Sequence, residues 1–541
     1  MKKNNNWKFL RRKRKFNKFK LKNVYISIVH FVSRFNRKIG KIRYLFLTYI
    51  FITIIGSLLL YWDISQVNPG DISYIDALFT SASAFSDTGL VVKNTYEQWT
   101  IFGQMIIAIL ILIGGIGIFA IKVYILNYIF GVKLGIFARD VLLLERSSHN
   151  IGDIRRVIIV SITIMFSILI VSSFILFFLF YYSEGNFIPN NNINNPKYDF
   201  NLSLRFAIFH SITALNNAGF DMIGKNSLAP YYGNYFLQIW LLFLFMLGGI
   251  GYPVIYDIYR FITSFFTSKR RSKYRFTLFS KISLVTYFSV AIVGLALLLT
   301  FELTSKDQRT FWNLSFSDPL YWGNGINIGY SYGSNFDKIF ALFFTSFSTR
   351  SAGFATFDLY NLSDPSLIIL SVLMFIGAAP SSTGGGIRST TLAIILLNLI
   401  SRMRGKNSTH LFKRKIKDET VNQSSIVLII SFILTFLAVL VLTTSFSTFG
   451  GKIAWDGATE LNKGLGRTYG ITNVLFEVTS AFGTTGLSTG ITSSLNTLSK
   501  ISLIFIMFIG QLGISSTILI WGSHNHKFTK FEYIEEDVTI G

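Results

Sequence analysis

The chain has 541 residues, of which 51% are hydrophobic and only 14% are charged, whereas about 25% of the residues of an average soluble protein are charged. It contains no cysteine, which excludes disulfides and thiolate metal sites. The composition therefore indicates a membrane protein. The formal net charge of +24 fits either nucleic-acid binding or the basic loops of a membrane protein, so the distribution of this charge has to decide.

The basic residues gather in a few segments. Residues 1–43 hold sixteen Lys or Arg and no acid, and the first carboxylate of the chain is Asp63. Two further clusters lie at 269–275 and 402–417, and apolar runs separate them. Because Lys and Arg collect in cytoplasmic loops, we favour a membrane protein over a nucleic-acid-binding one. We expect residues 1–42 to form a cytoplasmic arm that also binds anionic lipid, without a cleaved signal peptide.

Apolar runs of about 20 residues are long enough to cross a bilayer. Eight such runs lie at roughly 43–62, 99–127, 156–182, 235–262, 279–301, 365–400, 423–445 and 499–521. The connectors between them alternate between richer and poorer in excess basic residues, as expected for loops on opposite sides of a membrane. We therefore predict an all-α, multi-pass protein of the cell membrane with eight transmembrane helices and both termini in the cytoplasm.

Each pair of predicted helices encloses an amphipathic segment that is too short to span a membrane. These segments are 72–90, 202–220, 336–354 and 472–487, and each ends in a polar turn, a glycine and Leu or Phe. The glycines, spaced 130, 134 and 133 residues apart, are Gly89, Gly219, Gly353 and Gly486. Such an internal repeat orders the whole chain.

The repeated unit is a helix, a half-helix, a turn and a second helix. We assign the four pore repeats and the tail that follows them to residues 43–130, 154–265, 279–402, 421–524 and 525–541. Non-helical backbone at membrane depth is tolerated only where it is buried in protein or lines a water-filled path. The repeats therefore predict four turns around one pseudo-fourfold pore, whereas re-entrant segments that only pack are the alternative.

The four glycine turns, named so from here on, are the predicted cation site. Their residues are Ser86, Asp87, Thr88 and Gly89; Asn216, Asn217, Ala218 and Gly219; Arg350, Ser351, Ala352 and Gly353; and Gly483, Thr484, Thr485 and Gly486. Rings of backbone carbonyls replace the hydration shell of a potassium ion, and the negative C-terminal ends of the half-helices favour a cation.

The turns resemble the selectivity filters of the Trk/Ktr/HKT superfamily of potassium transporters. The matching motifs are FHSITALNNAGF (209–220), TSFSTRSAGF (345–354), MFIGAAPSSTGGGIRSTT (374–391) and LFEVTSAFGTTGLSTG (475–490). The resemblance covers about residues 43–541 and is greatest to the Ktr-type membrane subunit. It implies potassium uptake by a homodimer with one pore per subunit, regulation by a cytosolic nucleotide-binding RCK ring, and sodium as an additional coupling or activating ion.

The resemblance also bears on ion selectivity. In some plant members of the superfamily, serine at the first filter glycine accompanies sodium transport, and this chain has Gly89 at that position. Potassium is therefore favoured, and a less selective sodium and potassium transporter or channel is the alternative.

The sixth predicted span is interrupted by ten residues that do not favour a regular helix. They are Gly377, Ala378, Ala379, Pro380, Ser381, Ser382, Thr383, Gly384, Gly385 and Gly386. Proline removes a helix hydrogen bond and glycine loosens the backbone. The resemblance implies an intramembrane gating loop here, and a close-packing kink is the alternative. For the two GGIG motifs at 114–117 and 248–251, we favour helix packing over function.

Two residues depart from the family pattern. Gln511 stands where the family usually has an arginine below the filter, so it supplies no positive charge to hold the pore closed. Asp87 stands where the family usually has an apolar residue. Its carboxylate either adds a negative field near the ion path or accepts hydrogen bonds from the neighbouring turn, which we favour.

Arg350 is shared with the family although it is a cation beside a cation path. We expect it to lie behind the filter and to pair with backbone carbonyls or with a carboxylate, for which Glu477 is a candidate. A direct pore-lining role is the alternative.

Two other classes of function were compared with the pore. No nucleotide-binding loop or zinc-protease motif is found in the sequence, so we do not expect an enzyme. An alternating-access transporter with inverted repeats fits less well, because these repeats run in the same orientation.

Overall fold

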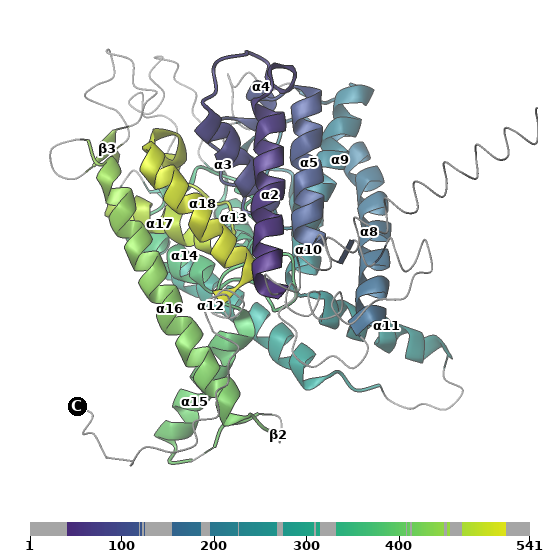
Figure 1. Ribbon diagram of the computed structural model, residues 1–541, viewed down its shortest axis with the longest axis vertical. Helices are drawn as coiled ribbons and strands as arrows, with labels where there is room; N and C mark the ends of the chain where they lie inside the picture. The colour runs from purple at the N-terminus through teal and green to yellow at the C-terminus, as the bar shows by residue number, and fades with distance from the viewer. Residues whose placement is uncertain are drawn as a thin grey trace, which may run out of the picture.

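The computed structural model describes residues 41–117, 120–121, 124, 154–185, 195–224, 227–267, 274–307, 310–313, 332–406, 408–411, 414–447, 452–454 and 468–514. The described part is mostly helical (Figure 1). Its α-helices are α2 (Lys41–Tyr61), α3 (Tyr74–Phe85), α4 (Thr95–Gln98), α5 (Ile101–Ile116), α8 (Ile154–Tyr182), α9 (Phe200–Leu215), α10 (Tyr235–Gly249), α11 (Tyr252–Thr267), α12 (Leu278–Thr304), α13 (Asn335–Ser348), α14 (Asp364–Phe375), α15 (Ser389–Met403), α16 (Asp418–Leu442), α17 (Ile471–Phe482) and α18 (Thr497–Leu512).

Two short β-hairpins accompany the helices. Strands β1 (His410–Leu411) and β2 (Arg414–Lys415) pair antiparallel between α15 and α16, with His410 opposite Lys415. Strands β3 (Ile453–Ala454) and β4 (Thr468–Tyr469) pair in the same way at the other end of α16, with Ile453 opposite Tyr469.

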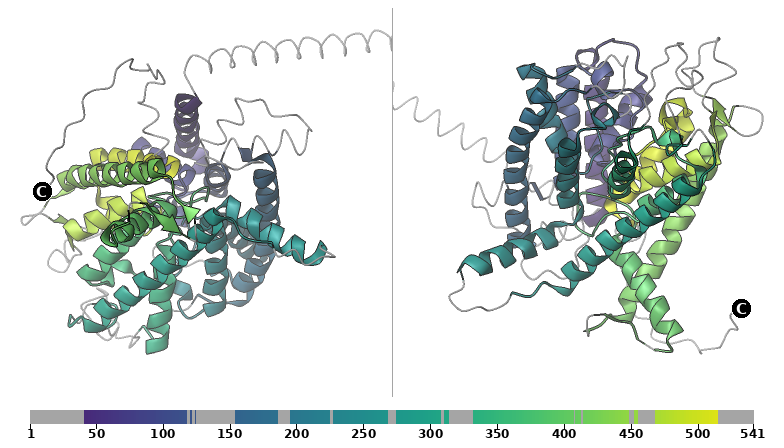
Figure 2. Two further views of the ribbon diagram at one scale, coloured as in Figure 1. Left: turned by 90° about the horizontal axis from the view of Figure 1, so that it is seen from below. Right: turned by 180° about the vertical axis from the view of Figure 1, so that it is seen from behind.

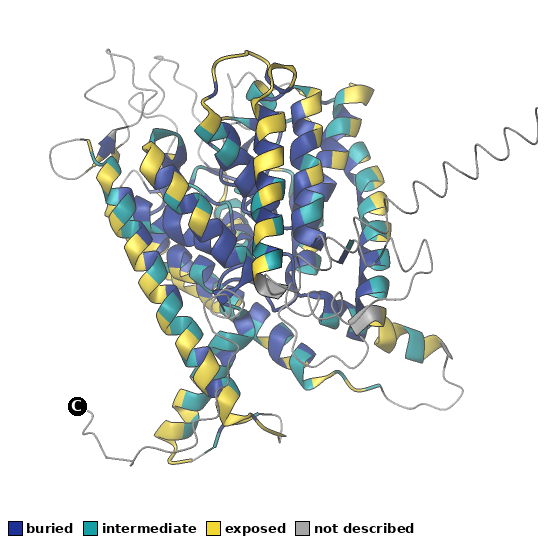
Figure 3. Ribbon diagram, viewed as in Figure 1, coloured by how far each residue is buried: buried dark blue, intermediate teal, exposed yellow. Residues whose placement is uncertain are grey.

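The long helices carry the apolar character of the chain. Among the described residues, the four helical segments that are long and apolar enough to cross a membrane are Arg43–Tyr61, Arg156–Tyr182, Leu278–Thr304 and Asp418–Ser445. Large apolar side chains on their outer faces are exposed, such as Phe51, Phe174 and Phe432. Figure 3 shows exposed residues along the outward faces of α2 and α16. In water such faces would be unfavourable, whereas lipid tails cover them at no cost.

The half-helices lie inside this frame. Helices α3, α9, α13 and α17 have 12 to 16 residues each. Ser73, Asp199 and Ser334 cap the N-termini of the first three, since each side chain accepts a hydrogen bond from a backbone amide of the first turn. Most residues in the second half of each half-helix are buried. The chain therefore places the C-terminal ends of these helices in the interior.

Neighbouring elements pack in the order of the repeats. Three of the half-helices contact the helices on either side of them in sequence: α3 packs against α2 and α5, α9 against α8 and α10, and α17 against α16 and α18. In the third repeat, α12 contacts both α13 and α14. Contacts of α5 with α9, α10 with α13, and α14 with α17 join successive repeats.

The first and last repeats also meet. Helix α18 packs against α3, as the yellow and purple helices of Figure 1 illustrate. Lys500 Nζ on α18 lies 2.8 Å from Asp76 Oδ1 in the first turn of α3. Both side chains are mostly buried, with 10% and 14% of their surface exposed. This ion pair links segments 424 residues apart and closes the set of repeats into a ring.

The fourth predicted span is not one helix. Residues 235–262 were expected to form a single helix, but α10 ends at Gly249 and α11 begins at Tyr252, with a bend of 104° between them. Gly251 has a φ of +88° at the break, a conformation that glycine adopts without steric cost. The expectation for 99–127 was also too long for one helix, because α5 ends at Ile116 and Gly117 follows with a φ of +85°.

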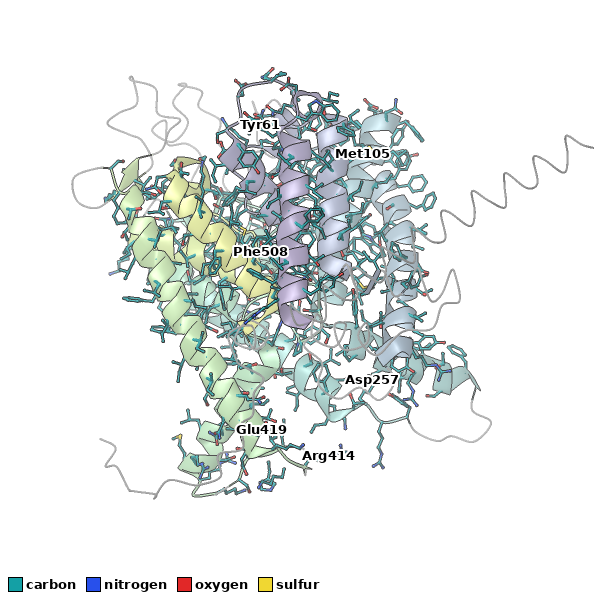
Figure 4. All side chains as sticks on the ribbon, in the orientation of Figure 1. Tyr61, Met105, Asp257, Arg414, Glu419 and Phe508 are labelled. Carbon is teal, nitrogen blue, oxygen red and sulfur yellow. The ribbon has the colours of Figure 1, made fainter. Side chains whose placement is uncertain are left out.

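Helix α11 is held to the start of α12 by a buried carboxylate. Asp257 accepts hydrogen bonds from Thr277 N at 3.1 Å, Ser280 Oγ at 2.7 Å and Tyr274 Oη at 2.8 Å. Figure 4 shows Asp257 at the lower end of the molecule. Seen from below and behind in Figure 2, α11 and α15 extend away from the main bundle.

Candidate functional site: four converging turns and the loop beneath them

The four glycine turns share one backbone conformation. The second residue of each turn has a positive φ although it is not glycine, with values of 50° for Asp87, 59° for Asn217, 66° for Ser351 and 44° for Thr484. Positive φ is uncommon for such residues. The closing glycines have φ values of 87°, 68°, 78° and 87°. Of the sixteen turn residues, all but Gly486 are buried.

Backbone hydrogen bonds fold each turn back onto its half-helix. Thr88 N donates to Ser83 O at 2.9 Å, Ala218 N donates to Thr213 O at 2.8 Å, and Thr485 N donates to Ser480 O at 2.8 Å. These six-to-one bonds resemble the Schellman motif, which ends helices at a left-handed residue. In the third turn, Ala352 N donates to Ser348 O at 2.9 Å. The turns are therefore continuations of the half-helix ends.

The glycines of the four turns converge on one another. A Cβ added to Gly89 would lie 2.4 Å from Ala218 O in the second turn. A Cβ on Gly353 would lie 2.3 Å from Thr485 O in the fourth turn. A Cβ on Gly486 would lie 2.1 Å from Thr88 O, which returns to the first turn. Backbone carbonyls and glycines from four distant segments thus gather at one place, where no side chain fits.

Arg350 is bonded to the helix that follows its own turn. It is fully buried, and its Nη2 donates a hydrogen bond to the carbonyl of Leu373 at the end of α14. The expectation of a carbonyl partner is therefore correct. Glu477, the candidate for the carboxylate alternative, accepts hydrogen bonds from Ser488 at 2.9 Å and from Thr492.

The two departures from the family pattern contact each other. Gln511 Nε2 donates a hydrogen bond to Asp87 Oδ2 at 3.2 Å, although the residues are 424 positions apart. Asp87 is fully buried. The expectation that Asp87 accepts hydrogen bonds holds for this contact, but the donor is on α18 and not on a neighbouring turn. The other expectation, a negative field near the ion path, stays a prediction.

The residues 377–386 form the irregular connection between α14 and α15, and all ten are buried. The connection packs against the α10–α11 break: Ala379 N donates to Gly249 O at 3.1 Å, and Tyr252 N donates to Ser381 O at 3.0 Å. It also packs against two of the turns. A Cβ on Gly384 would lie 2.6 Å from Ser351 Oγ, and one on Gly385 would lie 2.6 Å from Thr484 Oγ1.

Four glycines with positive φ mark the ends of the second helices. Gly117, Gly251, Gly386 and Gly513 have φ values of 85°, 88°, 76° and 82°. They follow α5, α10, the 377–385 segment and α18, at spacings of 134, 135 and 127 residues. We expected a break only in the sixth span and favoured packing for the two GGIG motifs. The last glycine of each motif was the missed signal, because its spacing matches the repeat.

A small polar cavity lies between the irregular connection and residues of α2, α5 and α18. The residues that line it are Tyr49, Gly114, Gly117, Ser381, Ser382, Arg388 and Gln511. Arg388 donates hydrogen bonds to Gly384 O and, at 3.2 Å, to Gln511 O. Arg388 and Tyr49 were not among the predicted site residues. Their position beside Gln511 could not be read from a linear pattern.

Comparisons with known proteins agree with this arrangement. A family model described as "TrkH: Cation transport protein" matches residues 48–526. The chain is 32% identical over 557 residues to the uncharacterized cation transporter MG322 of Mycoplasma genitalium, covering 92% of this chain and 96% of that protein. It is 33% identical over 460 residues to the Ktr system potassium uptake protein B of Bacillus subtilis, covering 85% of this chain and 88% of that protein.

The fold is also similar to that of a solved structure. The crystal structure of the potassium transporter TrkH from Vibrio parahaemolyticus superposes with a TM-score of 0.57 at 17% sequence identity, covering 88% of this chain and 83% of that one. With a family model that spans most of the sequence and relatives that match it nearly end to end, the chain belongs to the TrkH family of cation transport proteins.

Proposed function

We propose that this protein takes up potassium ions across the cell membrane through a pore whose selectivity filter is formed by the four glycine turns. The observation that carries the proposal is the convergence of the turns, where the carbonyls of Thr88, Ala218 and Thr485 approach the glycines of other turns. Rings of backbone carbonyls substitute for the water around a potassium ion. Family membership and the potassium-uptake name of the Bacillus subtilis relative support the choice of ion.

The half-helices support a cationic substrate. Helices α3, α9, α13 and α17 all end immediately before a glycine turn. The C-terminal end of a helix carries a partial negative charge, so four such ends favour a cation between them. The buried guanidinium of Arg350 donates a hydrogen bond to Leu373 O on α14.

Potassium is proposed over sodium because the first turn has no room for a side chain. A Cβ at Gly89 would meet Ala218 O at 2.4 Å, and serine there would displace a carbonyl of the second turn. A displaced ring would coordinate ions of another size. A less selective sodium and potassium transporter of the same family is the alternative that the experiment below tests.

We propose that residues 377–386 and Gln511 form the gate. The 377–386 segment lies directly against the third and fourth turns, and Gln511 is hydrogen bonded to the first. Unwound backbone inside a membrane protein is tolerated where it lines a water-filled path. Movement of this segment would open the cavity beside Gln511 to the turns above it.

The proposed orientation places the lower end of Figure 1 in the cytoplasm. Exposed basic residues of α15, the β1–β2 hairpin and the segment joining them gather there (Figures 1 and 4), namely Arg402, Arg404, Lys406, Arg414 and Lys415. Such charge marks the cytoplasmic side of membrane proteins. Eight membrane crossings, cytoplasmic termini and the repeat boundaries given above belong to the same proposal.

We also propose that a regulatory partner binds at this end of the molecule. The exposed basic surface offers a docking site for a cytosolic RCK ring, and a homodimer with one pore per subunit is the proposed assembly. The N-terminal arm, which we propose binds anionic lipid, lies outside the described residues except for its last two, Lys41 and Ile42.

Uptake of rubidium by the full chain in lipid vesicles tests the function. We expect protein-dependent rubidium uptake that excess potassium suppresses and excess sodium does not. Equal competition by sodium would favour the less selective alternative, and the absence of protein-dependent uptake would overturn the proposal. Repeating the assay with and without sodium shows whether sodium is required.

A further inference from the structure

Helix α11 leaves the bundle nearly at a right angle. It follows α10 after a bend of 104°, and in Figure 2 it extends away from the main bundle. Its first half is held in place, because Tyr252, Val254 and Asp257 are buried. Helix α10 itself packs inside the bundle against α9 and α13. With the spans upright in the membrane, as proposed above, α11 therefore runs close to the plane of the membrane surface.

The second half of α11 has one apolar side and one polar side. Residues three or four positions apart share one side of a helix. The residues that share the apolar side are Phe261, Ile262, Phe265 and Phe266. All four are exposed, the last two over 79% and 82% of their surface (Figure 3). Arg260 and Thr263 lie on the other side of the helix.

Exposed aromatic rings at this place fit a lipid surface. An amphipathic helix with Phe or Leu on one side and Lys or Arg on the other lies in the membrane interface, where its apolar side enters the boundary between headgroups and acyl chains. In water, the adjacent rings of Phe265 and Phe266, whose centroids are 5.6 Å apart, would form an unfavourable apolar patch. The orientation and the side chains of α11 therefore agree.

Two basic side chains lie beside this apolar side. The guanidinium of Arg260 lies over the ring of Tyr274, 4.8 Å from its centroid. The ring of Phe276 stacks on Phe261 at 5.6 Å. Both neighbours of Arg275 in the chain thus contact α11, which places Arg275 next to the helix, and its side chain is exposed.

The charge of this region selects an anionic partner. Residues 252–281 of the sequence contain seven Lys or Arg and one acid, Asp257. Asp257 is buried and accepts the hydrogen bonds from Thr277, Ser280 and Tyr274 described above. A second copy of the chain related by a twofold axis would bring the same positive charges face to face, which is unfavourable. Anionic headgroups of the cytoplasmic leaflet attract such a surface.

We propose that α11 is an interfacial helix that binds anionic phospholipids. Its apolar side, formed by Phe261, Ile262, Phe265 and Phe266, enters the cytoplasmic leaflet, while Arg260 and Arg275 bind the phosphate-bearing headgroups. The ligand is a lipid with a net negative headgroup, such as phosphatidylglycerol. The proposal goes beyond ion transport and uses only the orientation given under the proposed function.

Quenching by brominated lipids tests the contact in the full chain. Because the chain has no cysteine, Phe265→Cys offers a single site for a bimane fluorophore. In vesicles that contain a fixed minor fraction of brominated lipid, we expect brominated phosphatidylglycerol to quench this fluorophore more strongly than brominated phosphatidylcholine. At Phe432→Cys, on the exposed outer face of α16, the two lipids should quench equally. At Thr263→Cys, on the polar side of α11, iodide in the water should quench more than either lipid.

Charge variants in the Phe265→Cys chain test the headgroup site. Arg275→Gln should lower the preference for phosphatidylglycerol about fivefold, the effect of one basic residue at an anionic surface. Adding Arg260→Gln should abolish it, whereas Arg260→Lys, which keeps the charge, should retain it. The matched control is Arg402→Gln, since Arg402 is an exposed basic residue of α15 at the same end of the molecule. The control should leave the preference unchanged.

Three results would overturn the inference. Quenching at position 265 by iodide but by neither lipid would place α11 in water. Protection from iodide and from both lipids would indicate a protein partner or a second copy. Equal quenching by the two lipids would remove the anionic site. Rubidium uptake by the unaltered chain in the same vesicles is independent of these outcomes: uptake without a lipid preference leaves the proposed function intact, and a lipid preference without uptake contradicts only that function.

Discussion

The four glycine turns and the four helix ends beneath them follow the same sequence repeat, but the backbone conformation is more regular at the turns than at the helix ends. At the turns, the backbone angles of all four copies agree, and the glycines contact one another. At the helix ends, a positive-φ glycine also recurs, but one repeat has an inserted irregular segment of ten residues, 377–386, and another bends by 104°. A ring of ligands requires equivalent contributions, whereas a gate requires only one element that moves.

The largest change in rubidium uptake should come from a substitution that makes one glycine turn different from the other three. In Gly353→Ala, the new Cβ would lie 2.3 Å from Thr485 O, and the residue would be strained at a φ of +78°. We expect rubidium uptake to fall by roughly 100-fold or more, comparable to the loss of a preorganised electrostatic site. The control is Gly224→Ala, where a Cβ meets no atom within 4 Å. Normal uptake by Gly353→Ala would contradict a filter role for the turns.

Shortening the 377–386 segment should change the flux in the opposite direction. Deletion of residues 381–383 removes Ser381 and Ser382, which line the cavity, and keeps Gly384 and Gly385, which face the turns. If the segment obstructs the path, the flux should rise about tenfold, which corresponds to lowering the barrier by roughly 1.4 kcal/mol. Flux in vesicles at fixed potassium concentration measures this. A lower flux with normal protein folding would favour the close-packing alternative over the gate.

A smaller effect on the flux is expected from a substitution at the α10–α11 break, against which the 377–386 segment packs. Gly251→Ala places a Cβ 2.6 Å from Pro380 O and forces a side chain into a φ of +88°. The strain of about 1 kcal/mol should loosen the segment and raise the flux about fivefold. Gly233→Ala, where a Cβ meets open space, is the control. If both variants behave as the unaltered protein does, the α10–α11 break does not hold the gate.

The smallest effect should come from removal of the ion pair that joins the last repeat to the first, and it should be a loss of folding stability. Lys500→Met removes the mostly buried pair with Asp76 and should lower the free energy of unfolding by about 1 kcal/mol, since the pair lies between the exposed and the fully buried cases. Thermal unfolding in detergent measures it. Lys415→Met, which removes the exposed pair with Asp418, should leave the unfolding temperature unchanged. Equal effects of both substitutions would argue against closure by Lys500.

Much of the fold could be predicted because its strongest signals are local. The half-helices, the turns and the interruption at 377–386 follow from apolar runs, glycines and a proline at repeated spacings. The bend after α10 was missed because one glycine in an apolar run is also compatible with a straight helix. The positive φ of Gly251 breaks the helix, and this conformation depends on tertiary packing against Ser381 and Pro380.

The candidate site was less predictable because its partners come from distant repeats. Asp87 and Gln511 each stood out as unusual, but nothing in a linear pattern brings the first turn against the last helix. Glu477 was a candidate partner of Arg350 because of its charge. Two hydroxyl groups on the segment that follows its own half-helix, those of Ser488 and Thr492, reach its carboxylate instead.

The ion pair between Asp76 and Lys500 has a consequence for synthesis. Because α18 is the last described helix of the repeats and packs against the first half-helix, the ring can close only after almost the whole chain has been made. A chain that ends before Lys500 leaves Asp76 without this partner. Incomplete chains therefore cannot join the last repeat to the first, even when they already contain all four glycine turns.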